Sequence, residues 1–379
     1  MNRQQFLILL TLVIILGGGG LIIHQRGDRS WENAAATLGG PLLPNLPIND
    51  IAQITIHSGT GALHLARVDN LWRVRERGNY PANFSQISGW LIKLADLKIV
   101  QSDVVGPSQL GRFALLPPGP ATNTATQVEF AAANGKSLAS LLLGKPHLHQ
   151  PTGAQPAGMG NEAWPDGRYV MVGGNNSTLD VITDPQDNVV PQPDQWLNKD
   201  FIDVQKPGSI AVQFPVATNS WSLIRASETN DWQLVGAGPK EKLDADKISG
   251  LTSPLSSATF ADVLTPDARN AASRTDLTLL TVTTLEGFTY TARIGSKQAD
   301  NYPVTFSITA SFPATTGSMN ADALARQKTL TDKLAREQQY QNWTYLLPAY
   351  TLDPILKLRS DLLLTDTNTS TPAPAAPSK

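Results

Sequence analysis

Three short segments decide the fold: Ile51-Ala-Gln-Ile-Thr-Ile-His57, Ala62-Leu-His-Leu-Ala-Arg-Val68 and Leu71-Trp-Arg-Val-Arg75. In each segment apolar and polar residues alternate, which is the pattern of a strand with one buried face. Glycines and an Asp-Asn pair lie between the segments and favour tight turns. The sequence therefore predicts a meander of three antiparallel strands.

The same order of segments returns in the second half of the chain. Alternating runs cover residues 209–214, 221–225 and 231–235, and Trp72 and Trp232 take matching places in the two halves. A pattern that recurs at a fixed period indicates a repeated structural unit. We therefore expect an α+β fold with two tandem copies of a mainly antiparallel β domain, each with a covering helix, and with both tryptophans buried.

A helix is expected after each meander. The first has Asn83 as its N-cap and places four apolar residues on one face at helical spacing: Phe84, Ile87, Leu91 and Leu94. The second begins at Asp244, where Asp244 and Asp246 suit the positive end of the helix dipole. Pro254 should end this second helix early.

Each copy continues with a second hairpin, at residues 126–143 around Asn134-Gly135 and at residues 277–294 around Glu286-Gly287. Later strands are expected at residues 168–172, 179–183, 303–309 and 342–347. Residues 320–340 are rich in Ala, Lys, Gln and Arg and predict an exposed helix that only the second copy contains. This helix is either a docking element or a solvated covering helix.

The N-terminus carries the strongest local signal. Residues 6–23 contain no charge and consist mainly of Leu, Ile, Val and Gly; as a helix they would span roughly 27 Å, close to the thickness of the bilayer's hydrocarbon core. The alternative is a cleaved signal peptide, but the apolar run is longer than usual and the nearest small residues, Ala34-Ala35-Ala36, lie far downstream. An uncleaved transmembrane anchor is therefore predicted.

Charge does not set the orientation of this anchor, because Arg3 and the amino terminus on one side oppose Arg26 and Arg29 on the other. The short tail before the anchor and the weakly charged body after it favour a single-pass anchor with the bulk of the chain exported. Four glycines at residues 17–20 either let another helix approach closely or simply weaken packing.

These features divide the chain into five segments: an anchor at 1–30, a linker at 31–47, copy one at 48–205, copy two at 206–360 and a tail at 361–379. From residue 365 onward the chain contains no large apolar residue, which predicts a disordered tail.

Composition excludes several classes of function. Charged residues make up 16% of the 379 residues and the net charge is −2, so no basic field is present to hold nucleic acid. The chain has no cysteine, which excludes disulfides, thiolate catalysis and cysteine-bound metals. The hydrophobic fraction of 41% suffices for two cores.

Histidines give the only hint of a metal site. His147 and His149 would project to one side of a strand, but no third ligand stands at a recognisable spacing, and two solvated histidines are the alternative. His57 and His64 are expected to form an exposed cross-strand pair. Gly158-Met-Gly160 lacks the full glycine spacing and the βαβ context of a dinucleotide loop.

Motifs of the common enzyme classes are absent from the sequence. It contains no Gly-x-Ser-x-Gly elbow, no Walker A loop and no His-Glu-x-x-His helix. We therefore predict no catalytic, cofactor-binding or metal-binding residues, no cofactor, and a protein that is not an enzyme.

Several short motifs together resemble a bacterial family. They are Phe113-Ala-Leu-Leu-Pro-Pro118, a hairpin ending in Leu-Leu-Gly144, the strand with Tyr169, and Trp196-Leu-Asn-Lys-Asp200. In this order they resemble the bacterial domain of unknown function four-three-four-zero over most of residues 48–360. The sequence departs from that family at Ala114, where the family tends to have Gly, and the second copy lacks the first motif.

This resemblance implies a single-anchor envelope protein that accompanies ABC transporter subunits of the gliding-motility type, with no known chemistry. Two functions therefore stand side by side: a scaffold or accessory protein that partners a membrane complex, or a periplasmic module that binds a cell-wall glycan or a peptide. A concave pocket with convergent polar groups would favour the second function, and flat apolar patches the first.

Overall fold

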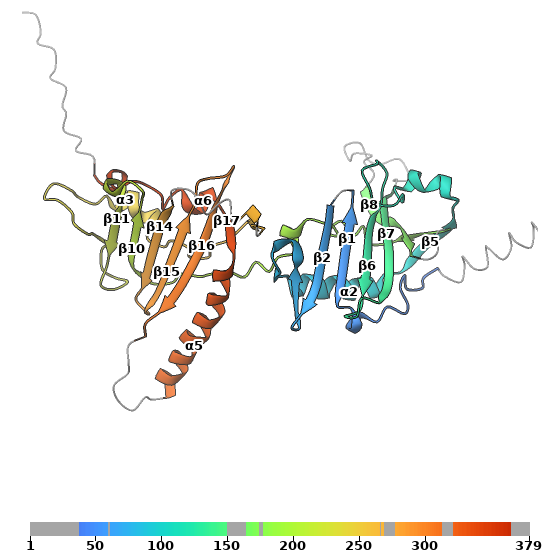
Figure 1. Cartoon of the computed structure of the whole chain (residues 1–379), viewed down its shortest axis with the longest axis horizontal. Helices are drawn as coiled ribbons and strands as arrows, with labels where there is room; N and C mark the ends of the chain where they lie inside the picture. Colours follow the sequence, from blue (N-terminus) through green and yellow to red (C-terminus); the bar gives the residue numbers. More distant parts are fainter. Residues whose placement is uncertain are drawn as a thin grey trace, which may run out of the picture. The chain divides into compact units, whose positions relative to one another are not determined.

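The structure is a computed structural model that describes residues 38–59, 61–149, 164–173, 177–265, 267–268, 277–312 and 321–364. The chain divides into two compact units, Met1–Asn198 and Lys199–Lys379. Each unit is built on one antiparallel sheet with few helices, so the fold is α+β, as the sequence predicts (Figure 1).

Within its described residues the first unit forms a nine-stranded sheet in the order β4-β3-β2-β1-β6-β7-β8-β9-β5. The strands are β1 Gln53–Ser58, β2 Gly61–Val68, β3 Leu71–Val74, β4 Tyr80–Pro81, β5 Ile99–Val104, β6 Thr126–Ala131, β7 Ser137–His149, β8 Trp164–Val172 and β9 Thr178–Ile182. The predicted meander is present as β1 to β3. Ile54 faces Leu65 and Ile56 faces Leu63 across β1 and β2, and all four side chains are fully buried.

One face of this sheet is covered by α2 (Phe84–Asp96), which lies across the strands in Figure 1. Asn83 is the N-cap, because its side-chain oxygen accepts a hydrogen bond of 3.1 Å from the backbone N–H of Gln86. Ile87, Leu91 and Leu94 are buried as predicted. Phe84 is not on the buried face: at the first helical position it is 65% exposed.

Short 3-10 helices complete the first unit: η1 Ile48–Asp50, η2 Arg75–Arg77, η3 Pro107–Phe113 and η4 Pro193–Trp196. η3 ends at Ala114, which adopts a left-handed conformation with φ of 53°. A glycine would adopt this conformation without strain. At Gly144 an added Cβ would overlap the carbonyl oxygen of Phe113, so only glycine fits there.

Eight strands form the sheet of the second unit over its described residues, in the order β12-β11-β10-β14-β15-β16-β17-β13. They are β10 Pro207–Gln213, β11 Trp221–Ile224, β12 Gln233–Leu234, β13 Asp262–Val263, β14 Thr278–Thr284, β15 Phe288–Ile294, β16 Asn301–Ala310 and β17 Thr344–Pro348. Helices are α3 Ala245–Ile248, α5 Ala321–Gln338 and α6 Ala349–Leu352, with 3-10 helices η5 Ala217–Asn219, η6 Ser249–Leu251, η7 Gln339–Asn342 and η8 Arg359–Leu362.

The strand order of the two sheets agrees when β1, β2 and β3 are matched with β10, β11 and β12, and β6 to β9 with β14 to β17. β5 and β13 then occupy the same edge, and β4 has no counterpart among the described residues of the second unit. The predicted early end of the second helix is confirmed: Asp244 caps α3 by accepting from the backbone of Asp246 and Lys247, and α3 passes into η6 after four residues.

The two predicted tryptophan positions differ in burial. Trp72 pairs with Arg67 in the β2–β3 ladder and is 6% exposed. Trp232 precedes β12 in the matching place, with the guanidinium of Arg225 4.6 Å from its ring centroid, but it is only half-buried. The prediction of burial is therefore wrong for Trp232. In the second unit it is Trp221 that is buried, with its indole N–H donating to the carbonyl of Lys357 at 2.7 Å.

Three predicted boundaries change. The described part of the linker, residues 38–47, is attached to the first unit: Leu42 is buried and its N–H donates to Leu97. Residues 199–205 belong to the second unit. The predicted tail starts later than residue 361, since Leu362 is fully buried in η8 and Leu364 donates to Lys242. The residues from 365 onward lie outside the described part.

The predicted anchor at residues 6–23 also lies outside the described residues. Among the helices that are described, none has the length and apolar character needed to cross a membrane.

Candidate functional site

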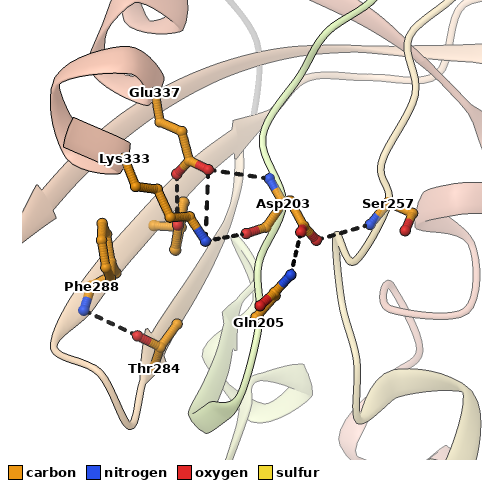
Figure 2. Close-up of polar contacts among 8 residues, drawn as sticks. Asp203, Gln205, Ser257, Thr284, Phe288, Lys333 and Glu337 are labelled. Atoms are coloured by element: carbon orange, nitrogen blue, oxygen red, sulfur yellow. Dashed lines mark hydrogen bonds and ion pairs between the residues drawn. The ribbon is translucent and has the colours of Figure 1, made fainter. Parts of the chain in front are cut away.

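The C-terminal end of α5 carries the most buried carboxylate among the described residues of the second unit. Glu337 is 1% exposed, whereas the rest of α5 is half-buried or open to solvent. Its carboxylate accepts a hydrogen bond of 2.7 Å from the Tyr290 hydroxyl on β15 and one of 3.4 Å from the backbone N–H of Asp203. The Lys333 ammonium, one turn earlier on α5, lies 3.8 Å from the same carboxylate (Figure 2).

Lys333 extends this contact to the chain that enters the second unit. Its ammonium donates to the carbonyl oxygen of Asp203 at 2.8 Å and stands 5.2 Å from the centre of the Phe288 ring. The Asp203 carboxylate in turn accepts from the side chain of Gln205 at 2.6 Å and from the backbone N–H of Ser257 at 3.4 Å, as Figure 2 shows. These contacts connect α5 with β15 and with the segments around Asp203 and Ser257, which lie far apart in the sequence.

Burial shapes the electrostatics of this network. It raises the pKa of Glu337, while the hydrogen bond from Tyr290 and the charge of Lys333 act in the opposite direction. The pKa of the Tyr290 hydroxyl is raised by burial and by the neighbouring carboxylate. Tyr290 and Glu337 are buried and Lys333 and Asp203 are half-buried, and the four residues are bonded to one another. The arrangement therefore fastens α5 to the sheet. We call Tyr290, Lys333, Glu337 and Asp203 the α5 clamp.

The remaining surface of α5 is available for contact. The helix lies beside β16, and in Figure 1 its N-terminal turns extend beyond the ends of β15 and β16. Arg326 makes an ion pair of 3.6 Å with Glu286, on the clamp side of the helix. On the opposite side Leu324, Lys328 and Asp332 are exposed. The predicted exposed helix is thus present, except that its Glu337 is buried.

His147 and His149 lie on one strand, because β7 continues six residues past its predicted end at residue 143. The structure adds Asp166 from β8, which sequence spacing does not reveal. Its carboxylate is 2.6 Å from Nδ1 of His147 and 3.3 Å from Nδ1 of His149. The hydrogen bond with His147 is the main reason that the pKa of Asp166 is lowered.

This trio is a cluster of polar contacts closed within the protein. An oxygen and a nitrogen 2.6 Å apart share a proton and leave no room for an ion between them. In the described ranges, no group of three or more His, Asp or Glu side chains is arranged to hold a metal ion. Aromatic rings flank the cluster, with Tyr169 beside His147 and Trp164 beside His149.

A cavity of about 490 Å³ opens beside Trp90 in the first unit. One wall is the flank of α2 with Gln86, Trp90 and Lys93, and the other is the loop after β9 with Gln186 and Asp187. The Trp90 indole N–H donates to the side-chain oxygen of Gln186 at 2.8 Å. Its ring makes an edge contact with Trp196, at 5.5 Å between centroids. Sequence analysis did not identify this site, because its two walls lie about 100 residues apart.

The other predicted residues serve local structure. His57 and His64 are not a cross-strand pair: the register sets Ala62 opposite His57, and His64 instead contacts Glu76, with 2.6 Å between Nδ1 and the carboxylate. Both histidines are half-buried. Gly158 and Gly160 lie outside the described residues.

Comparison with known proteins adds no relative: no family model, no curated protein and no solved structure matches this chain.

Proposed function

We propose that this chain is a membrane-anchored, non-enzymatic accessory or scaffold protein of the cell envelope that docks a membrane partner through the exposed side of α5. The observation that carries the proposal is the placement of α5. The helix is inserted between β16 and β17, whereas only five residues separate the matching strands β8 and β9. The α5 clamp fastens its C-terminal end and leaves an outward stripe of mixed charge.

The two units are, in this proposal, tandem copies of one domain. Support comes from the shared strand order and from the matching pairs Arg67–Trp72 and Arg225–Trp232. An element that one copy has and the other lacks is a natural place for a function acquired after duplication.

Residues 6–23 supply the single-pass anchor in the bacterial inner membrane, with the bulk of the chain in the periplasm, and ABC-transporter-type subunits are the partners that the family resemblance suggests. The ionisable clusters described above are occupied by contacts within the protein, as at the α5 clamp and at His147, His149 and Asp166. This supports a docking role over a chemical one.

The test is affinity purification of the full chain from membranes, followed by identification of the subunits that accompany it. The docking variant combines Leu324→Glu with Lys328→Glu, two exposed positions away from the clamp. A matched control places the same two changes at Val216 and Lys240, which are also exposed in the second unit.

We expect the docking variant to lose a subunit that the wild type and the control retain, with an unchanged melting temperature. Recovery of the same subunits with both variants would contradict docking through α5. Loss of function after replacing a single exposed Asp, Glu or His, in a protein that folds and reaches the membrane, would contradict the non-enzymatic assignment.

The second candidate is a periplasmic ligand-binding module. It is favoured by one observation, the cavity beside Trp90, in which polar groups from α2 and from the loop after β9 converge.

A further inference from the structure

We propose that the cavity beside Trp90 binds a short neutral saccharide. This assigns a site and a ligand class to the first unit and goes beyond docking through α5, on which it does not depend. A volume of about 490 Å³ falls within the usual range for small-ligand sites.

The loop wall of the cavity is preformed. Gln186 has a positive φ of 54°, an unfavourable conformation for a residue with a side chain, and is 6% exposed. Its N–H donates to the Asp184 carboxylate at 2.8 Å, its carbonyl accepts from Val189 and Arg168, and its side-chain oxygen accepts from Trp90. Strained residues that are held by several contacts concentrate at ligand sites. This wall therefore needs no rearrangement to receive a ligand.

Trp90 provides apolar surface at the cavity. The buried face of α2 consists of Ile87, Leu91 and Leu94, whereas Trp90 lies at its flank and is only half-buried. Its N–H is already bonded to Gln186, so what it offers a ligand is ring surface. In the second unit Leu251 follows Ile248-Ser249-Gly250 as Trp90 follows Ile87-Ser88-Gly89, and Leu251 is fully buried.

The positive and negative groups at the cavity are equal in number. Asp184 and Asp187 line it together with Lys93, and Arg168 lies 3.7 Å from Asp187. Two positive and two negative groups favour neither an anion nor a cation. The lining also contains the uncharged polar residues Ser85, Gln86 and Asn188 and the apolar residues Val189 and Trp196.

A sugar ring fits this chemistry. It presents C–H groups that can pack on an indole face, and hydroxyls that can hydrogen-bond to amides, hydroxyls and carboxylates. The lining offers both kinds of contact, because the indoles of Trp90 and Trp196 lie beside uncharged polar residues. This combination, together with the balanced charges, favours a neutral saccharide.

The test uses the full chain in a detergent without a sugar headgroup. Binding of cellobiose, maltose and the N-acetylglucosamine disaccharide is measured by isothermal titration calorimetry, with tetramethylammonium as a cationic probe. We expect saturable binding of at least one disaccharide and none of tetramethylammonium. Failure of all three disaccharides at millimolar concentration, or binding of the cation alone, would overturn the assignment.

Variants locate the binding. Trp90→Ala should weaken it about tenfold or more, and Asn188→Ala, at an exposed lining position, should weaken it without affecting folding. Trp164→Ala is the matched control, because Trp164 is 50% exposed in the same unit and does not line the cavity. Equal weakening by Trp90→Ala and Trp164→Ala, or unchanged affinity in Asn188→Ala and Trp90→Ala, would place the sugar elsewhere and refute the proposal. The Leu324→Glu/Lys328→Glu docking variant should bind sugar normally, which separates failure of this inference from failure of the docking proposal.

Discussion

Replacing Tyr290 by Phe tests whether the α5 clamp holds the helix to the sheet. The substitution removes one hydroxyl, fits the same space and leaves the Glu337 carboxylate, 1% exposed, without its 2.7 Å donor. A hydrogen bond to a charged group contributes about 1.5–3 kcal/mol, and a buried acceptor left unpaired lies at the upper end. We therefore expect a loss of about 2–3 kcal/mol, which for a unit of this size lowers its melting temperature by roughly 4–12 °C.

The stability lost in Tyr290→Phe should depend on pH, in a direction set by the pKa of Glu337. Burial raises the folded-state pKa of Glu337 above the ordinary 4.5, so its contribution to stability is fully present below 4.5 and is lost as pH rises through the folded-state value. Without the Tyr290 hydroxyl the folded-state pKa rises further. Tyr290→Phe should therefore be least destabilising below pH 4.5 and most destabilising at neutral pH.

The matched control is Tyr302→Phe. Its hydroxyl also donates to a carboxylate at 2.7 Å, that of Asp353, but this pair is open to solvent and Asp353 is 49% exposed. Loss of this exposed hydrogen bond should lower the stability clearly less than loss of the buried one. Calorimetric melting of the wild type and both variants from acidic to neutral pH is the assay. The clamp is refuted if Tyr290→Phe is no more destabilising than Tyr302→Phe at neutral pH.

Three further predictions follow from particular residues. Trp72→Ala should cost about 3–5 kcal/mol and Trp232→Ala clearly less, because only Trp72 is buried; urea denaturation measures both, and equal costs would contradict the difference in burial. Arg359 and the backbone N–H of Gly238 hold the pKa of Glu241 at about 2, so its contribution to stability is present above pH 4.5 and is lost as pH falls toward 2. In Glu241→Gln this acid-dependent loss should be smaller, as read from melting temperatures across that range; an unchanged acid profile would argue against the ion pair. The full chain should fractionate with membranes and require detergent, whereas a periplasmic soluble form with its N-terminus near residue 37 would show that residues 6–23 are a signal peptide.

The local sequence pattern is sufficient to predict the strands of the meander and the capped helix. Alternation places Ile54, Ile56, Leu63 and Leu65 in the core, and Asn83 caps α2 as its side chain predicts. Alternation does not predict the partial exposure of Trp232. Burial of a side chain depends on what covers the sheet, and the sequence of the strand does not encode this. The edge strands β5 and β13 were missed for a similar reason: β5 exposes Val100 and Val104, and β13 has two residues.

The candidate sites depend on contacts that no local pattern reports. Composition predicted α5, but the burial of Glu337 requires Tyr290, 47 residues earlier. The partner of His147 is Asp166, reached only because β7 continues through Pro146 into a longer hairpin. Trp90 meets Gln186 across 96 residues, so the cavity exists only once the sheet has formed.

The long reach of the α5 clamp has a consequence for biosynthesis. The first unit is complete once Asn198 has been made, because the backbone N–H of Asn198 donates to Pro81 and the strands and the Trp90 cavity use residues up to this boundary. The second cannot close until α5 joins Asp203, 134 residues before Glu337, and until β17 pairs with β16 and β13. At about 5–20 residues per second, synthesis of the second unit takes roughly 9–36 s. The first unit can therefore fold before the second, in which β10 pairs early with β11 and β14 but the core closes only with the last quarter of the chain.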